Sequence, residues 1–157
     1  WIEVARRHAN PAFRAMIAEG IALVDKAMRL RRPGAYQVQA AIAALHARAP
    51  RPEDTDWTEI ELLYATLERL QPSPVVTLNR AVAIAMADGP RAGLARLEPL
   101  AEPLAAYHPY HAARAELLRR AGDDRDARGA YDRAIALASN GRERAALERR
   151  RASLDSP

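Results

Sequence analysis

Histidine side chains are the first candidates for chemistry in this sequence, because two of the four stand three residues apart. His108 and His111 have a spacing at which two imidazoles on one helix face can bind a metal ion. We expect His108, which precedes Pro109, to lie outside the helix, and His8 and His46 supply no third ligand at a convincing spacing. The pattern therefore favours histidines in capping or interfacial positions and predicts no metal and no cofactor.

Nucleophilic and phosphate-binding chemistry has no candidate in the sequence. The chain has no cysteine, and the surroundings of Ser73 and Ser139 predict helix caps rather than nucleophiles. A phosphate-binding loop needs clustered glycines, whereas the glycines here are isolated. They are predicted at helix ends (Gly89, Gly122 and Gly141) and inside helices at close helix–helix contacts (Gly20, Gly93 and Gly129). We therefore expect a protein that is not an enzyme.

Composition favours a helical protein of the cytoplasm. Hydrophobic residues make up 49% and aromatic residues 5% of the 157 residues, so the core must consist of Ala, Leu, Ile and Val. The absence of cysteine suits a reducing cytosol, and no apolar run reaches the roughly 18 residues that span a bilayer. The sequence starts with Trp1 rather than Met, so we expect a piece of a longer chain.

The net charge of +4 raises the question of nucleic-acid binding. The basic residues are interleaved with Asp and Glu rather than gathered in one block, and all but Lys26 are arginine. Because arginine and alanine have GC-rich codons, the base composition of the genome is a sufficient cause for this excess. The charge alone therefore favours a solvated surface over a nucleic-acid interface.

Proline, glycine and capping residues divide the sequence into eight predicted helices, and nothing indicates a strand. The first is predicted from Pro11 to near Arg32, with an apolar stripe of Phe13, Ile17, Ile21, Val24 and Met28. The second is predicted over Ala35–Arg48, the third after a cap at Asp56, and the fourth over Pro74–Asp88. The fifth starts at Pro90 and the sixth ends at Ala121. The seventh covers about Asp123–Ala138, and the eighth follows a cap at Asn140. Glu59 and Glu143 follow their caps by three residues, as in a capping box.

A period of 34 residues runs through the second half of the chain. Pairs at this distance are Ala81 and Ala115, Gly93 and Ala127, Leu97 and Tyr131, and Leu100 and Ala134. Small residues let two helices approach closely, and a bulky residue fills the space beside them, which is typical of tetratricopeptide repeats. We predict an all-α, tetratricopeptide-like solenoid of helical hairpins with about seven to eight helices and a C-terminal capping helix. A plain orthogonal bundle is the alternative.

The predicted organisation is a single domain over residues 1–157. It comprises an N-terminal helix (1–33), a divergent helical pair (34–72), two tetratricopeptide-like repeats (73–107 and 108–140), and a capping helix with a tail (141–157).

Polar residues on otherwise apolar helices are the candidates for partner binding. They either line a groove or tie helices together by hydrogen bonds. The second role is favoured for Gln37 and for Asn79, which we expect to tether a loop. Both roles stay open for Arg114 and for Arg80, and we expect Arg80 to project to a groove or an acidic partner. Tyr36 and Trp57 are added as amphipathic anchors, and His111 is added as a histidine. The predicted partner-binding set is therefore Tyr36, Gln37, Trp57, Arg80, His111 and Arg114.

Three stretches carry a family resemblance. They read GAYQVQAAIAALHA, DTDWTEIELLYATLERLQPSPVVTLNRAVAIAMADGP and YHPYHAARAELLRRAGDDRDARGAYDRAIALASN. They resemble the tetratricopeptide-like C-terminal extension of a group of bacterial extracytoplasmic-function (ECF) sigma factors. The resemblance covers about residues 15–154, its most specific part is LQPSPVVTLNRAVA, and the first dozen residues match least.

The resemblance implies a longer parent in which sigma regions that read promoters and bind polymerase precede this chain. Those regions would contact DNA and direct core RNA polymerase to promoters. The extension would be a regulatory protein-interaction domain of a sigma-70 family ECF sigma factor in the cytoplasm, away from the membrane. Its implied partners are the sigma regions of its own parent chain, core RNA polymerase, or a small DGPF-motif protein.

Two other functions stay open. In an auxiliary nucleic-acid-binding domain, Arg142, Arg144 and Arg149 to Arg151 would contact phosphates. In a small-molecule-sensing helical domain, His108, Tyr110, His111 and Arg114 would line a site between helices. Homodimerisation is compatible with each of these functions.

Overall fold

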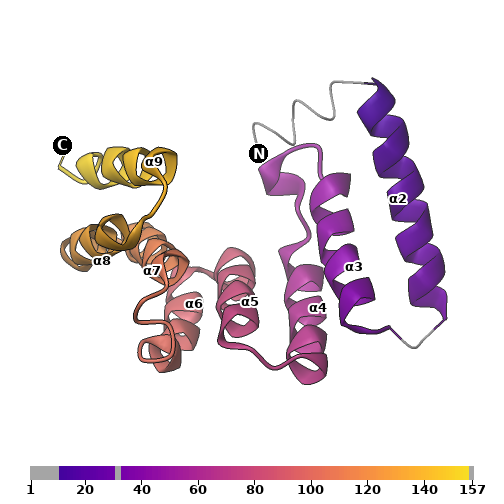
Figure 1. Cartoon of the computed structure of the whole chain (residues 1–157), viewed down its shortest axis with the longest axis horizontal. Coiled ribbons are helices and arrows are strands. Elements are labelled where there is room, and N and C mark those ends of the chain that lie inside the picture. Colours follow the sequence, from indigo (N-terminus) through magenta and orange to yellow (C-terminus); the bar gives the residue numbers. More distant parts are fainter. Residues whose placement is uncertain (1–10, 31–32, 156–157) are drawn as a thin grey trace. The chain divides into compact units, whose positions relative to one another are not determined.

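The computed structural model describes residues 11–30 and 33–155, which form eight α-helices and two short 3-10 helices with no strand (Figure 1). The predicted all-α class is therefore confirmed. The chain divides into two compact units, residues 1–76 and 77–157, at a boundary inside the first turn of α5 (Pro74–Asp88). The single domain over residues 1–157 stays a prediction, and each unit is described by itself below.

The first unit contains α2 (Pro11–Arg29), α3 (Ala35–Arg48), the 3-10 helix η1 (Pro52–Asp54) and α4 (Trp57–Leu70). Helix α3 packs against both α2 and α4 (Figure 1). Its predicted bounds are confirmed, and Val38, Ile42 and Leu45 lie buried on one face as their spacing requires. On α4 the buried residues are Ile60 and Leu67.

Two features of the first helix differ from the prediction. Helix α2 ends at Arg29 rather than near Arg32, and its last turn is closed by the Leu30 N–H, which donates to the Ala27 carbonyl at 3.2 Å. Phe13, expected in the packed stripe, is 45% exposed. Since α2 has 19 residues and α3 has 14, the two helices cannot cover each other along their whole length. The Arg48 guanidinium, 2.6 Å from Asp25 Oδ1, ties the two helices together.

The second unit contains the rest of α5, then α6 (Pro90–Leu97), the 3-10 helix η2 (Glu98–Leu100), α7 (His108–Ala121), α8 (Asp124–Leu137) and α9 (Gly141–Ala152). Local signals set most of their ends as predicted, and the start of α7 is an exception described below. Gly122 has a φ of 81° and closes α7, and Gly89 has a φ of 99° between α5 and α6. The Asn140 side chain accepts a hydrogen bond from the Arg142 N–H at 2.9 Å and caps α9.

Residues 34 positions apart are buried in both members of each pair. Ala81, Leu97 and Leu100 lie in a cluster of α5, α6, η2 and α7, and their counterparts Ala115, Tyr131 and Ala134 lie in a cluster of α7, α8 and α9. Leu147 joins the second cluster as the buried residue of α9.

The interior glycines do not share one role. Gly93 lies against α5, where an added Cβ would touch the Ala85 side chain and approach the Ala81 carbonyl oxygen to 2.8 Å. A close helix–helix contact is therefore confirmed for Gly93. The same prediction is wrong for Gly20 and Gly129, since a Cβ at either position would meet nothing within 4 Å.

Within the described residues, none of the helices combines the length and the apolar character that crossing a membrane requires.

Candidate functional site

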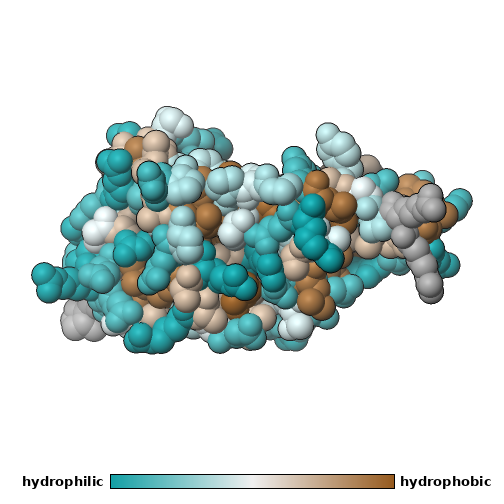
Figure 2. All heavy atoms as spheres, turned by 90° about the horizontal axis from the view of Figure 1, so that it is seen from below, coloured by the Kyte–Doolittle hydropathy of each residue, from teal (hydrophilic) through white to brown (hydrophobic). Residues whose placement is uncertain are grey.

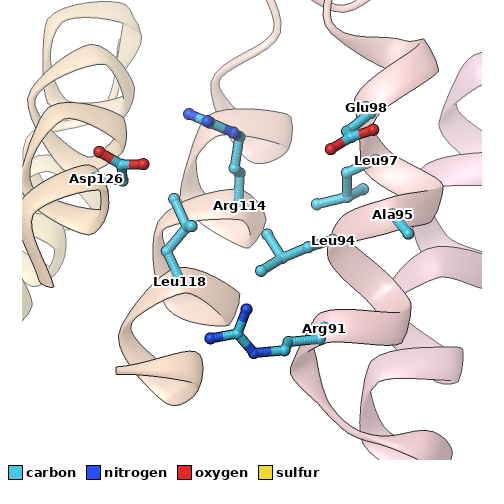
Figure 3. A pocket seen from close by; sticks show the side chains of 8 residues that line it. All are labelled: Arg91, Leu94, Ala95, Leu97, Glu98, Arg114, Leu118 and Asp126. Atoms are coloured by element: carbon cyan, nitrogen blue, oxygen red, sulfur yellow. The ribbon is translucent and has the colours of Figure 1, made fainter. Parts of the chain in front are cut away.

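A cavity of about 320 Å³ in the second unit combines charged and apolar lining residues. It lies between α6, α7 and the start of α8 (Figure 3), and its lining residues are Arg91, Leu94, Ala95, Leu97, Glu98, Arg114, Leu118 and Asp126. Buried neighbours on the same helices hold these side chains in place, because Gly93 fixes α6 against α5 and Ala115 is fully buried on α7. The sequence predicted one of its residues, Arg114.

Charged side chains of both signs surround an apolar base in this cavity. Figure 3 shows Arg114 extending from α7 into the space between Asp126 and Glu98, with Arg91 at the other end and the leucines between them. The Arg91 guanidinium lies 3.9 Å from Asp123 Oδ1 and is 78% exposed, so this ion pair adds little stability. Within the described part of the chain Arg114 forms no ion pair, so its donors are open to a carboxylate of another molecule.

The lining residues provide both charge and apolar surface. None of the eight is Ser, Thr, Cys, Lys or His, and two are carboxylates, Glu98 and Asp126. Such a set can recognise a ligand, because guanidinium groups bind carboxylates in a bidentate manner and leucines contact apolar side chains.

The two histidines with metal-ligand spacing are held apart. The expectation that His108 lies outside the helix is wrong, since it is the first residue of α7. Its ring Nε2 lies 3.6 Å from Glu143 Oε2, whereas the His111 ring nitrogen lies 2.9 Å from the Ala105 carbonyl oxygen. Over residues 11–30 and 33–155, no group of three or more His, Cys, Asp or Glu side chains is placed to hold a metal ion.

The four residues proposed for small-molecule sensing do not converge on this cavity. His108 and His111 have the partners just described, and Tyr110 is buried beside the His111 ring, with 5.0 Å between the ring centroids. Burial raises the pKa of Tyr110, against the opposing effect of the charge on Arg114. Only Arg114 of the four lines the cavity.

A polar network that the sequence analysis missed lies between α7 and α8. The Tyr131 hydroxyl donates to Glu116 Oε2 at 3.0 Å, and Arg119 donates to both oxygens of Glu116 at 3.1 and 2.7 Å. Burial acts to raise the pKa of Glu116, but the hydrogen bonds from Arg119 and Tyr131 outweigh it and lower that pKa. The i, i+3 spacing of Glu116 and Arg119 is the signal that was available in the sequence. We assign this network to the fold rather than to a site.

Three residues of the predicted partner-binding set lie in the first unit. Tyr36 is 83% exposed on α3, as a partner-binding anchor requires. Gln37 has a structural role, since its Oε1 accepts a hydrogen bond from the Gly34 N–H at 3.1 Å. Trp57 packs edge-on against His46, with 5.2 Å between the ring centroids, and burial lowers the pKa of that histidine. Tyr36 and Gln37 are exposed and Trp57 is half-buried, but of the two exposed residues only Gln37 has a hydrogen bond that gives it a role within the chain.

The other three lie in the second unit. Arg80 is half-buried on α5, His111 contacts the chain before α7, and Arg114 lines the cavity. The neighbouring Asn79 is exposed on α5, and within the described residues it makes no hydrogen bond that would tether a loop, so that expectation is wrong.

The arginines of α9 differ in whether they have partners within the chain. Arg151 binds Asp132 at 2.7 Å and Asp155 at 3.2 Å, and Arg144 donates to the Ala138 carbonyl at 2.9 Å. Two of the five arginines proposed for phosphate contact are therefore engaged within the chain. The other three, Arg142, Arg149 and Arg150, are exposed, so the nucleic-acid hypothesis stays a prediction with fewer candidate phosphate contacts.

Comparison with known proteins gives one informative match. The chain is 64% identical over 132 residues to an uncharacterized protein of Rhizobium meliloti (strain 1021). The matched region covers 84% of this chain and 31% of that relative, so the chain spans about a third of the length of the relative. No family model and no solved structure matches the sequence.

Proposed function

We propose that this chain is a regulatory protein-interaction domain of a sigma-70 family ECF sigma factor, with its helices arranged as a tetratricopeptide-like solenoid. The burial of all four residue pairs at a distance of 34 positions supports that arrangement. The resemblance of the three quoted stretches to the extension of such factors supports the sigma assignment. In this proposal the domain acts in the cytoplasm and modulates promoter-directed transcription by RNA polymerase.

The observation that carries the proposal is the charged cavity of the second unit. Arg114 forms no ion pair within the described residues and lies at a cavity that also presents Arg91 and three leucines. A partner segment with a carboxylate next to an apolar side chain would satisfy both features. Because a guanidinium binds a carboxylate in a fixed bidentate geometry, Arg114 is expected to contribute most of the specificity.

The partner in this proposal is protein rather than nucleic acid. We assign it to the sigma regions of the parent chain or to core RNA polymerase. A small DGPF-motif protein is the remaining candidate.

A first test is binding of the 157-residue chain to core RNA polymerase and to the separated sigma regions of its parent, measured by titration calorimetry. We expect one of them to bind, and Arg114→Ala to weaken binding about tenfold through loss of about 1.4 kcal/mol. Arg96→Ala is the matched control, because Arg96 is exposed on α6 and does not line the cavity. Binding to neither partner, or equal effects of the two variants, would overturn this site.

A second test addresses the sigma assignment itself. Promoter-directed transcription in vitro is compared for the full parent protein and for the parent truncated before Trp1. We expect the truncation to change the yield of specific transcripts while the remaining regions still bind polymerase. The sigma assignment fails if the reading frame before Trp1 encodes no sigma regions, or if transcription is the same with and without residues 1–157.

A further inference from the structure

Helix α2 carries a second apolar stripe beside the one that faces α3. Its members are Phe13, Met16, Gly20, Leu23, Ala27 and Leu30, which follow one another alternately three and four residues apart. The four large side chains are 45, 66, 62 and 76% exposed in that order. Alternation of three and four is the heptad spacing with which two helices pack along each other. An exposed apolar surface of this regularity indicates a contact with another molecule.

The adjoining surface of the first unit is also apolar and hollowed. A groove of about 270 Å³ runs between α2 and α3, and its lining residues are Ile17, Gly20, Ile21, Val24, Ala40, Ala43, Ala44 and Ala47. On the part of the face in Figure 2 that belongs to this unit, hydrophobic atoms are exposed among hydrophilic ones. Because the alanines and Gly20 project little or no side chain from this surface, another helix can approach closely.

Gly20 lacks an explanation within the chain. A glycine inside a helix costs about 1 kcal/mol relative to alanine. A Cβ at Gly20 would meet nothing within 4 Å, so the fold gains no close contact in return. Its place in the exposed stripe suggests that the missing side chain makes room for a residue of another molecule.

We propose that the second molecule is another copy of this chain, and that α2 forms an antiparallel homodimer with its counterpart. The sizes of the stripe residues fit a twofold arrangement centred between Gly20 and Leu23. In that register Gly20 faces Leu23 of the second copy, Met16 faces Ala27, and Phe13 faces Leu30. A small residue thus meets a large one at each of the inner positions, which is the complementarity that a self-associating surface requires.

The charges beside the stripe favour the same orientation. Glu19 and Lys26 are exposed, each directly precedes a stripe residue, and neither forms an ion pair within the described residues. In the antiparallel register Glu19 faces Lys26 of the second copy, and the twofold axis generates this opposite-charge pair twice. In a parallel pair Glu19 would face Val24 instead, and both charges would lack a partner. Charges at these flanking positions set orientation in paired helices.

The first test measures the molar mass of the 157-residue chain by sedimentation over a series of concentrations. We expect a reversible dimer, and Leu23→Glu to raise its dissociation constant about 100-fold by placing a charge in the centre of the contact. Leu62→Glu is the matched control, because Leu62 on α4 is 61% exposed in the same unit and lies outside the stripe. A chain that stays monomeric throughout, or two variants with equal effects, would overturn the proposal.

The second test exchanges the charges and does not depend on changing an apolar residue. Glu19→Lys and Lys26→Glu each place like charges opposite each other, so each variant alone should dimerise more weakly than the wild type. A mixture of the two variants should form a heterodimer, because every facing pair is then of opposite charge. If the mixture stays monomeric while the wild type dimerises, the antiparallel register is wrong.

Discussion

Gly93→Ala tests the packing of α6 on α5 with a single methyl group. The added Cβ would touch the Ala85 side chain, approach the Ala81 carbonyl oxygen to 2.8 Å and approach Leu117 Cδ1 to 3.0 Å. Leu117 can change its rotamer, but the other two atoms move only if the backbone of α5 moves. The substitution must therefore separate two helices whose residues form one buried cluster.

The expected change in the free energy of unfolding follows from two opposing effects. Alanine in a helix interior is favoured over glycine by about 1 kcal/mol. Overpacking of a tight core costs typically about 1–3 kcal/mol, and the upper part of this range applies because two of the three neighbours are rigid. We therefore expect Gly93→Ala to lower the free energy of unfolding by about 2 kcal/mol.

Urea unfolding followed by circular dichroism measures this change, and the chain offers a matched control. Gly129 also lies inside a helix, but a Cβ there meets nothing within 4 Å, so Gly129→Ala should raise the free energy of unfolding by up to about 1 kcal/mol. The two variants should thus change stability in opposite directions. A Gly93→Ala chain as stable as the wild type would show that α5 and α6 are not in close contact at this position.

Two further substitutions test buried polar groups. Burial and the neighbouring Glu116 raise the pKa of Tyr131 to about 12, above its usual value of 10.0. This pKa is higher in the folded chain, so its contribution to stability is complete below pH 10 and is lost as the pH rises towards 12. Tyr131→Phe should lower the free energy of unfolding by about 1 kcal/mol at neutral pH and abolish the decline over that range in pH-dependent urea titrations. The buried Thr55 Oγ1 has no hydrogen-bond partner within the described residues, so Thr55→Val should raise the free energy of unfolding by about 1 kcal/mol. A loss of stability in Thr55→Val would show that the hydroxyl is hydrogen-bonded in solution.

The ends of most helices were predictable because they depend on local chemistry. Ala35–Arg48 and Pro74–Asp88 have the predicted bounds, since proline, glycine and capping side chains act on the backbone within a few residues. The start of α7 was misjudged for a related reason. Pro109 is the second residue of that helix, where its missing N–H is not required, so His108 lies inside the helix rather than before it.

The cavity at Arg114 was less predictable than the helices, because it depends on which helix faces pack against each other. Arg114 was identified as a polar residue in an apolar segment, but its neighbours at the cavity, such as Glu98 and Asp126, come from other helices. The same holds for Glu116, whose partner Tyr131 is 15 residues away. Periodicity gives the buried face of each helix, whereas the pairing of side chains across helices requires their mutual orientation.

The roles of the three interior glycines cannot be distinguished from the sequence, but they can be distinguished in the structure. Each has the same intrinsic cost in a helix, and the sequence offers no means to separate them. For Gly93 the structure provides the reason within the chain, in the contact with α5. For Gly20 and Gly129 the structure provides no such reason, so the surface around each glycine must indicate its role. Gly129 lies among charged residues of α8, where an empty position is filled by water, whereas Gly20 lies between exposed apolar residues of α2, where it leaves room for a partner. A costly residue that the fold does not use therefore indicates a contact with another molecule only where its surroundings are apolar.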